Sequence, residues 1–366
     1  MKVAFRVDSS FNIGTGHVMR CLSLAAELRR RNCDVTFISR LHPGHINSFI
    51  ESQGHKVLAL PFTSPQGERS SLYGPDWLGT SQEQDLAETT SLIQGMSFEW
   101  LIVDHYSLDR SWERGMRSFC KRILVIDDLA DRSHDCDILF DQTFGRQVAD
   151  YQPLVNPESH FLVGSVYALL RPEFAELRAK SLSRRHNNTL SQVLISMGGV
   201  DKINATRDVL MGFEKLNRPE IKKIIVILGK SATWLSDIQE FKKSSKLPIE
   251  LVIDTNKMGE IMINCDLAIG ATGGSTWERC TLGLPTLSYV IAENQELIAQ
   301  KLEEAGATTI VGRYDSKLDY PLFKQLIESY IQDPSLLTEL SKKSETVSAG
   351  NGVGLVCDEM LKGRFA

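Results

Sequence analysis

The sequence has little of what marks several protein classes. Its 366 residues contain no apolar run near the ~18 residues that cross a membrane, so no membrane span is expected. Basic residues are not in surplus: 41 Lys and Arg against 46 Asp and Glu give a net charge of −5, which argues against a dedicated nucleic-acid-binding protein. This balance still leaves room for local basic sites that bind phosphate.

Paired cysteines are also absent. The seven cysteines are scattered and none stands in a C-x-x-C motif, which favours reduced, mostly buried thiols over a disulfide framework. Met1-Lys2 leads directly into a strand-like apolar run, so we expect no signal peptide and a cytoplasmic location. His42 and His45 have the spacing of metal ligands, but no Cys or carboxylate stands at metal-ligand spacing near them. We therefore expect neither a metal nor another cofactor.

What the chain does have is a regular alternation of short β-branched runs with helical patterns. Its length predicts about two domains, and its hydrophobic content of 42% is that of a globular protein. Strand, helix and strand in repetition predict parallel sheets with helices on both faces. Strands are expected at residues 3–7, 34–39, 56–60, 100–104, 122–126, 138–140, 160–163, 192–197, 223–228, 250–253, 267–270 and 286–289.

The alternation pauses near residues 171–190 and then restarts, which predicts two Rossmann-like domains. The first covers 1–170 and the second 171–366, whose last helix packs within its own domain or back on the first. The charged run Arg184–Asn188 is expected to be a solvated part of the linker, and residues 63–81 to form a long irregular loop. Ligands of such sheets bind at the carboxyl ends of the strands, so we expect an α/β fold of two doubly wound domains facing across a cleft.

The first candidate site is the glycine-rich turn after the first strand. Gly14 and Gly16 permit a tight turn and the close approach of a ligand, and backbone N–H groups at the following helix start would face that ligand. His17 opens the helix, and a neutral imidazole near pH 7 can accept a proton from water. The alternative is a helix-start histidine that bonds locally. Tyr106 belongs to a polar cluster after a later strand, which either lines the cleft or orients a loop.

Two more glycine-rich turns follow strands in the second half of the chain. Amides and hydroxyls at the start of the helices that follow them suit a diphosphate. The candidate residues are Met197, Gly198 and Gly199 in the first turn and Gly274, Ser275 and Thr276 in the second. Glu278 could accept both hydroxyls of a ribose, or it only caps its helix. Asn294 and Gln295, after another strand, suit sugar hydroxyls, or they cap the next helix.

Several motifs of the chain occur together, and in this order, in one known family. They are segments 5–9, 13–17 with Arg20, 103–106, 127–128, 136–139, 167–174 and 197–199, the Glu278 helix and 294–295. On these motifs the chain resembles, over about residues 1–300, the UDP-sugar hydrolases of pseudaminic acid biosynthesis. That family removes UDP from UDP-2,4-diacetamido-2,4,6-trideoxy-β-L-altropyranose.

The resemblance implies a glycosyltransferase-B-like fold that holds the nucleotide mainly in its C-terminal half and uses no metal. It makes His17 the proton acceptor that activates water, and Arg171 and Glu278 substrate contacts. Val200 departs from the family pattern, in which Thr often follows the two glycines, so one hydroxyl contact is absent. The implied reaction is attack of water at the anomeric carbon with inversion, in a nonulosonic acid pathway that serves flagellin or surface polysaccharide.

Two other functions stay open. A UDP-sugar-dependent glycosyltransferase on the same fold would use a carbohydrate hydroxyl in place of water. A catalytically inert nucleotide-sugar sensor would bind UDP without turnover, although the intact His17 argues against it. In each case the expected partner is a UDP-linked sugar.

Overall fold

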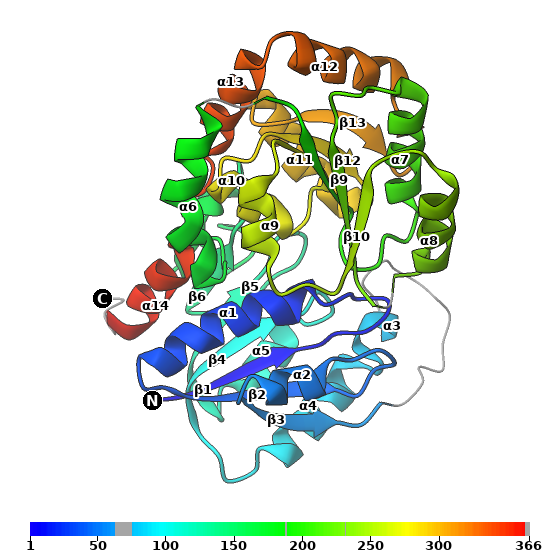
Figure 1. Cartoon of the computed structure of the whole chain (residues 1–366). Helices are drawn as coiled ribbons and strands as arrows, with labels where there is room; N and C mark the ends of the chain where they lie inside the picture. Colours follow the sequence, from blue (N-terminus) through cyan, green and yellow to red (C-terminus); the bar gives the residue numbers. More distant parts are fainter. Residues whose placement is uncertain (63–74, 187–188, 231, 363–366) are drawn as a thin grey trace. The chain divides into compact units, whose positions relative to one another are not determined.

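The computed structural model of the chain describes residues 1–62, 75–186, 189–230 and 232–362 (Figure 1). The chain forms two compact units. Unit 1 consists of Met1–Leu169 and Gly352–Ala366, and unit 2 of Leu170–Asn351. Most of the irregular loop expected at 63–81 lies outside the described residues.

Unit 1 is built on a parallel sheet in which each strand pairs with its neighbours in the order β3-β2-β1-β4-β5-β6-β7. The central strands are apolar along almost their whole length because helices cover both faces of a parallel sheet. The strands are β1 (Lys2–Val7), β2 (Asp34–Arg40), β3 (Lys56–Leu60), β4 (Phe98–Asp104), β5 (Cys120–Ile126), β6 (Ile138–Asp141) and β7 (His160–Val163).

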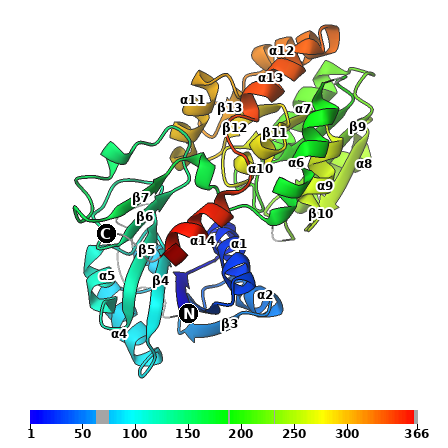
Figure 2. The same cartoon turned by 90° about the vertical axis from the view of Figure 1, so that its left-hand side faces the viewer.

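Two hydrophobic cores lie on the two faces of this sheet. Apolar side chains of α1, α2 and α14 form one core with residues such as Phe5, and those of α4 and α5 form the other, which contains Trp112. Figure 2 shows the last helix, α14, beside α1, so the C-terminal segment completes the core of unit 1. The helices are α1 (Gly16–Arg30), α2 (Asn47–Ser52), α3 (Pro75–Leu78), α4 (Gln82–Leu92), α5 (Arg110–Met116), α14 (Gly352–Lys362) and the 3₁₀ helices η1 (Val148–Asp150) and η2 (Ser165–Tyr167).

Unit 2 repeats this architecture with the strand order β10-β9-β8-β11-β12-β13-β14, parallel except for β14. Its strands are β8 (Gln192–Ser196), β9 (Lys223–Leu228), β10 (Ile249–Ile253), β11 (Leu267–Ala271), β12 (Thr286–Val290), β13 (Thr309–Arg313) and β14 (Lys317–Leu318). Its helices are α6 (Pro172–Arg185), α7 (Ala205–Leu216), α8 (Leu235–Ser244), α9 (Met258–Asn264), α10 (Ser275–Thr281), η3 (Glu293–Gln295), α11 (Glu296–Glu304), α12 (Tyr320–Gln332) and α13 (Ser335–Ser344).

The predicted fold class is confirmed: two sheets dominated by parallel strands, each with helices packed on it. Each strand expected from the sequence is present, and all seven cysteines are buried. The prediction that the run from Arg184 is solvated is wrong for Arg185, whereas the Arg184 side chain is 34% exposed. Arg185 is 2% exposed, and Arg184 pairs with Asp266. Both side chains reach back to the end of α9, so the helix that carries them is packed into unit 2 rather than free in solvent.

Candidate active site

In unit 1, the N-terminal candidate residues meet at the carboxyl ends of neighbouring strands. His17 follows the turn after β1, Asp104 ends β4, and Asp128 comes two residues after β5. Because β1, β4 and β5 are adjacent and parallel, these side chains share one edge of the sheet. Gly14 has a φ of +80°, which makes the predicted tight turn possible. Its N–H bonds to Ser10 O at 2.9 Å, so that amide serves the turn and not a ligand.

The His17 ring is held by a buried carboxylate. Its Nδ1 lies 2.6 Å from Asp104 Oδ1. Burial alone would raise the pKa of Asp104, but the charges of Arg20 and His17 hold it well below its usual value. An ionised carboxylate only accepts hydrogen bonds, so His17 Nδ1 must be the donor. In the neutral imidazole Nε2 then carries the lone pair, and none of the described residues bonds to it. A neutral His17 ring held in this way could accept a proton at Nε2.

Arg20 connects this pair to a second carboxylate. It lies one turn after His17 on α1 and donates to both oxygens of Asp104, at 2.6 and 2.7 Å. It also donates to Asp128 at 2.9 Å. Asp128 is partly buried, with 19% of its side chain exposed. This burial would raise its pKa, but Arg20 lowers that pKa below the usual value. Two carboxylates thus share one guanidinium, which fixes the orientation of Asp104 under His17.

Two aromatic rings stand beside the imidazole. The Tyr106 ring meets His17 edge to face at 4.7 Å between centroids, and Trp77 stacks on Tyr106 at 5.4 Å. Tyr106 is 6% exposed, and its hydroxyl donates to Asp128 at 2.5 Å. Of the two roles that the sequence left open for Tyr106, these contacts support the orienting one. Trp77 was not predicted; its only signal was an aromatic residue in an irregular, proline-containing segment.

A buried charge cluster beneath the turn was also missed. Asp8 is fully buried and accepts from Arg6 at 2.6 Å and from the backbone N–H of Arg40 at 2.7 Å. His42 and His105 each place Nε2 within 3.4 Å of the same carboxylate. Asp8 therefore joins the ends of β1 and β2 to two loops. Asp8 lies in the motif at residues 5–9, but the sequence does not indicate which distant side chains it contacts.

In unit 2, Arg171 and Glu278 come together. Arg171 Nη2 lies 2.9 Å from Glu173 and 4.0 Å from Glu278, and Nη1 donates to Asn256 O at 3.3 Å. Burial raises the pKa of Glu278 to about 7, and Arg171 opposes this shift only in part. No backbone N–H of the described residues donates to the Glu278 carboxylate, so Glu278 does not cap α10 through a hydrogen bond. Its carboxylate remains available to a ligand.

The loop that precedes α10 is tied to the loop after β12 by Gln295. The Gln295 side-chain oxygen accepts from Thr272 Oγ1 and from Ile291 N, both at 3.3 Å. Its side-chain nitrogen lies 3.6 Å from where a Cβ would stand on Gly273. The adjacent Asn294 is exposed. Gln295 therefore holds the loop in place with its oxygen, and its nitrogen lies next to the loop's glycines.

The first glycine-rich turn of unit 2 is only partly accessible to a ligand. Met197 is fully buried in the core, so it offers no surface to a ligand. Gly198 and Gly199 are exposed, and Gly198 has a φ of +80°. The carboxylate of Asp201 accepts two backbone N–H groups of the first turn of α7, each at 2.9 Å. The start of α7 is thus already capped by the chain itself, which the sequence-based interpretation did not foresee.

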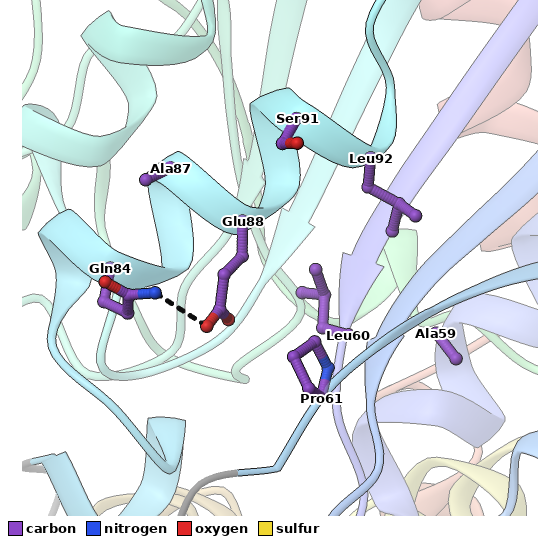
Figure 3. Close-up of a pocket in the computed structure, with 8 residues that line it drawn as sticks. All are labelled: Ala59, Leu60, Pro61, Gln84, Ala87, Glu88, Ser91 and Leu92. Carbon is purple, nitrogen blue, oxygen red and sulfur yellow. Dashed lines mark hydrogen bonds between the residues drawn. The ribbon is translucent and has the colours of Figure 1, made fainter.

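Unit 1 also contains a hollow of about 350 Å³ at its edge strand (Figure 3). It lies between β3 and α4 and is lined by Ala59, Leu60, Pro61, Gln84, Ala87, Glu88, Ser91 and Leu92. Gln84 donates to Glu88 across one turn of α4 at 2.8 Å. None of the predicted site residues lines it, and its one carboxylate pairs with buried Arg40. The hollow is therefore separate from the candidate site.

In residues 1–62, 75–186, 189–230 and 232–362, no three His, Cys, Asp or Glu side chains are grouped so as to hold a metal ion. Over the same part of the chain, no helix is long and apolar enough to pass through a bilayer.

The chain is similar in sequence to several curated proteins, including two that match most of its length. The chain is 28% identical over 303 residues to an uncharacterized protein of Methanocaldococcus jannaschii, covering 81% of this chain but only 56% of that protein. It is 27% identical over 307 residues to the UDP-2,4-diacetamido-2,4,6-trideoxy-beta-L-altropyranose hydrolase of Campylobacter jejuni, covering 84% of this chain and 97% of the hydrolase. No model of a known protein family matches the chain.

Among solved structures, MurG of Acinetobacter baumannii has a similar fold. The TM-score is 0.68 at 15% identity, with 99% of this chain and 100% of MurG covered. At this identity the likeness concerns the fold alone. The chain thus has the fold class that the sequence predicted, two Rossmann-like domains.

Proposed function

We propose that this protein is a nucleotide-sugar hydrolase that releases UDP from UDP-2,4-diacetamido-2,4,6-trideoxy-β-L-altropyranose in pseudaminic acid biosynthesis. The observation that carries the proposal is the 2.6 Å contact between His17 and Asp104, which leaves Nε2 of the imidazole able to accept a proton. The similarity to the Campylobacter hydrolase, which extends over 84% of this chain, supports the choice of substrate.

In the proposed reaction, His17 Nε2 accepts a proton from water while the water oxygen bonds to the anomeric carbon. The bond between that carbon and the diphosphate oxygen breaks, and UDP leaves with the electron pair. The sugar is released with the opposite anomeric configuration because one displacement occurs. The negative charge of Asp104 stabilises the imidazolium that forms. A positioned general base contributes about 10²–10⁴-fold to a rate.

The nucleotide is assigned to unit 2. Glu278 accepts the ribose hydroxyls, and Arg171, which is always charged, donates to a phosphate or sugar oxygen. Amides at Gly274 and Ser275 face the diphosphate, and hydrogen-bond donors of this kind stabilise a leaving group without a metal. Ribose contacts are equally strong before and during the reaction, so they contribute to binding rather than to the rate of the chemical step.

The test is incubation with a panel of UDP-linked diacetamido sugars in water labelled with ¹⁸O, followed by NMR and mass spectrometry. We expect free sugar without any acceptor, the label in its anomeric hydroxyl and none in UDP. His17→Gln should abolish most turnover and leave UDP affinity unchanged. His160→Gln, at a β7 side chain that is 41% exposed, is the matched control and should behave as the wild type.

The alternative is a UDP-sugar-dependent glycosyltransferase, since the chain is also 25% identical over 191 residues to an N-acetylglucosamine transferase of Caldanaerobacter subterraneus that uses a UDP-sugar. UDP release that requires a carbohydrate hydroxyl would establish transfer and reject hydrolysis. Label in UDP, or initial retention of the anomeric configuration, would reject direct attack on the anomeric carbon.

A further inference from the structure

Four arginines in the described part of the chain are almost completely buried: Arg6, Arg40, Arg185 and Arg279. A buried guanidinium remains charged, so its burial is unfavourable unless another charge offsets it. Arg6 and Arg40 each form two ion pairs with carboxylates of unit 1. Arg185 and Arg279 form no ion pair with a described carboxylate, so their charges must be balanced in another way.

Arg185 is balanced within the fold. Its guanidinium donates to the backbone oxygens of Met262, at 2.9 Å, and of Cys265. These carbonyls lie at the C-terminal end of α9, where unpaired carbonyl groups carry partial negative charge. Asp266 adds negative charge nearby. Groups of the protein itself therefore offset the positive charge of Arg185.

Arg279 has no such compensation. It is 1% exposed and donates to Ala271 O at 2.7 Å, Ser275 Oγ at 3.0 Å and Thr276 Oγ1 at 3.3 Å, all neutral groups. Its Nε has no partner among the described residues, as is also true of Arg40 and Arg185. Burial lowers the pKa of Arg279 to about 10, so the group stays protonated at neutral pH. The neighbouring Glu278 offsets little of the positive charge of Arg279, because its carboxyl has a pKa of about 7 and is only partly ionised at neutral pH.

The two hydroxyls that accept from Arg279 differ in what they can donate. Thr276 is 3% exposed, and its hydroxyl donates a hydrogen bond to Ala271 O at 3.4 Å. Ser275 is half-buried, and its hydroxyl proton has no acceptor in the described part of the chain. Because Arg279 donates to the Ser275 oxygen, the hydroxyl hydrogen of Ser275 must point away from that guanidinium. A hydroxyl bonded to a cation is a stronger donor than an isolated one.

We propose that Arg279 is a built-in positive charge that the diphosphate of the bound nucleotide neutralises, and that it acts on the ligand through the Ser275 hydroxyl. This inference rests on the proposed function and makes Arg279 a positioning residue. The buried side chain of Arg279 also requires glycine at position 270 of β11, because a Cβ there would lie 2.7 Å from Arg279 Nη1. The proposed role of Arg279 also predicts that the site selects a nucleoside diphosphate over the uncharged nucleoside.

The test is calorimetric titration of UDP and of uridine into the full chain and its variants. Arg279→Met should weaken UDP binding about 10- to 100-fold, as expected for loss of a hydrogen bond to a charged group, and change uridine binding little. Ser275→Ala should lower the preference for UDP in the same way. Arg279→Lys, which keeps the charge, should recover part of that preference. Arg185→Lys and Arg185→Met are the matched controls and should leave the ratio of the two affinities unchanged.

The outcomes separate this inference from the proposed function. Equal losses of UDP and uridine affinity in the Arg279 variants would make Arg279 purely structural and overturn the inference. If Arg279→Met does not fold, Ser275→Ala and Arg279→Lys decide, because an unchanged ratio in both contradicts it. Failure of the wild-type protein to bind UDP would instead reject the proposed function on which the inference rests.

Discussion

The substitution Asp104→Asn tests the proposed role of Asp104 in holding and charging His17 during the reaction. Asp104 is fully buried and bonds to His17 and Arg20. Asparagine has nearly the same shape, but it brings an N–H₂ donor and no charge. The variant therefore keeps the packing and removes the charge that stabilises a protonated His17. It also replaces one of the two acceptor oxygens with a donor, so the tautomer of His17 is no longer fixed.

The size of the effect follows from the geometry. Two unit charges about 4 Å apart interact by about 4 kcal/mol at an effective dielectric constant of about 20. Arg20 takes up part of this interaction, since its Nη2 lies 3.1 Å from His17 Nδ1 and opposes an imidazolium. We therefore expect kcat to fall by about 10²–10³-fold, which corresponds to about 2.7–4 kcal/mol. UDP affinity should not change, because the proposed nucleotide contacts belong to unit 2.

The assay combines UDP release at saturating substrate with urea unfolding. Asp128→Asn is the matched control, because it also removes a carboxylate from Arg20 but leaves the partner of His17 in place. Both variants should lose stability, and only Asp104→Asn should lose most of its kcat. The folded-state pKa of Asp104 lies below its unfolded value, so its stabilising contribution is complete above about pH 4 and is lost as the pH falls towards the folded pKa. Equal kcat losses in the two variants, or a nearly unchanged kcat in Asp104→Asn, would refute the reasoning.

Three further predictions follow. Because burial raises the pKa of Glu278 to about 7, the folded protein holds a proton that the unfolded chain releases above about pH 4.3, so stability falls between those values. Glu278→Gln should remove this decline in urea unfolding, and its UDP affinity should be lower and lose its rise with pH; a wild-type pH profile in the variant would contradict this. Met360→Ala, at a 1% exposed position in the core of unit 1, should lower the free energy of unfolding by about 2–5 kcal/mol. Leu361→Ala, at the adjacent 38% exposed position, should change it by less than about 0.5 kcal/mol, and similar losses in both would show that α14 is not part of the core. Finally, turnover should survive EDTA treatment; activity lost to chelation and restored by Mg²⁺ or Mn²⁺ would reject the metal-free reaction.

The sequence by itself determined the elements and the local turns. Alternating apolar runs specified every strand from β1 to β12, because burial on both faces of a parallel sheet imposes that pattern residue by residue. Local sequence patterns also predicted a tight turn at Gly14, which has a positive φ, and a helix start at His17. They failed at β13 and β14, where Gly312 interrupts one short strand and the other has only two residues.

The pairing of distant side chains was decided only by the tertiary structure. His17 meets Asp104 because β1 lies between β2 and β4, and no local pattern encodes that strand order. The same holds for the return of α14 to unit 1. Arg185 and Arg279 look like ordinary charged helix residues in the sequence, and both are buried. Whether such a charge meets a carboxylate, a helix end or only neutral groups depends on which segments the sheet brings together, and local patterning carries no information about that.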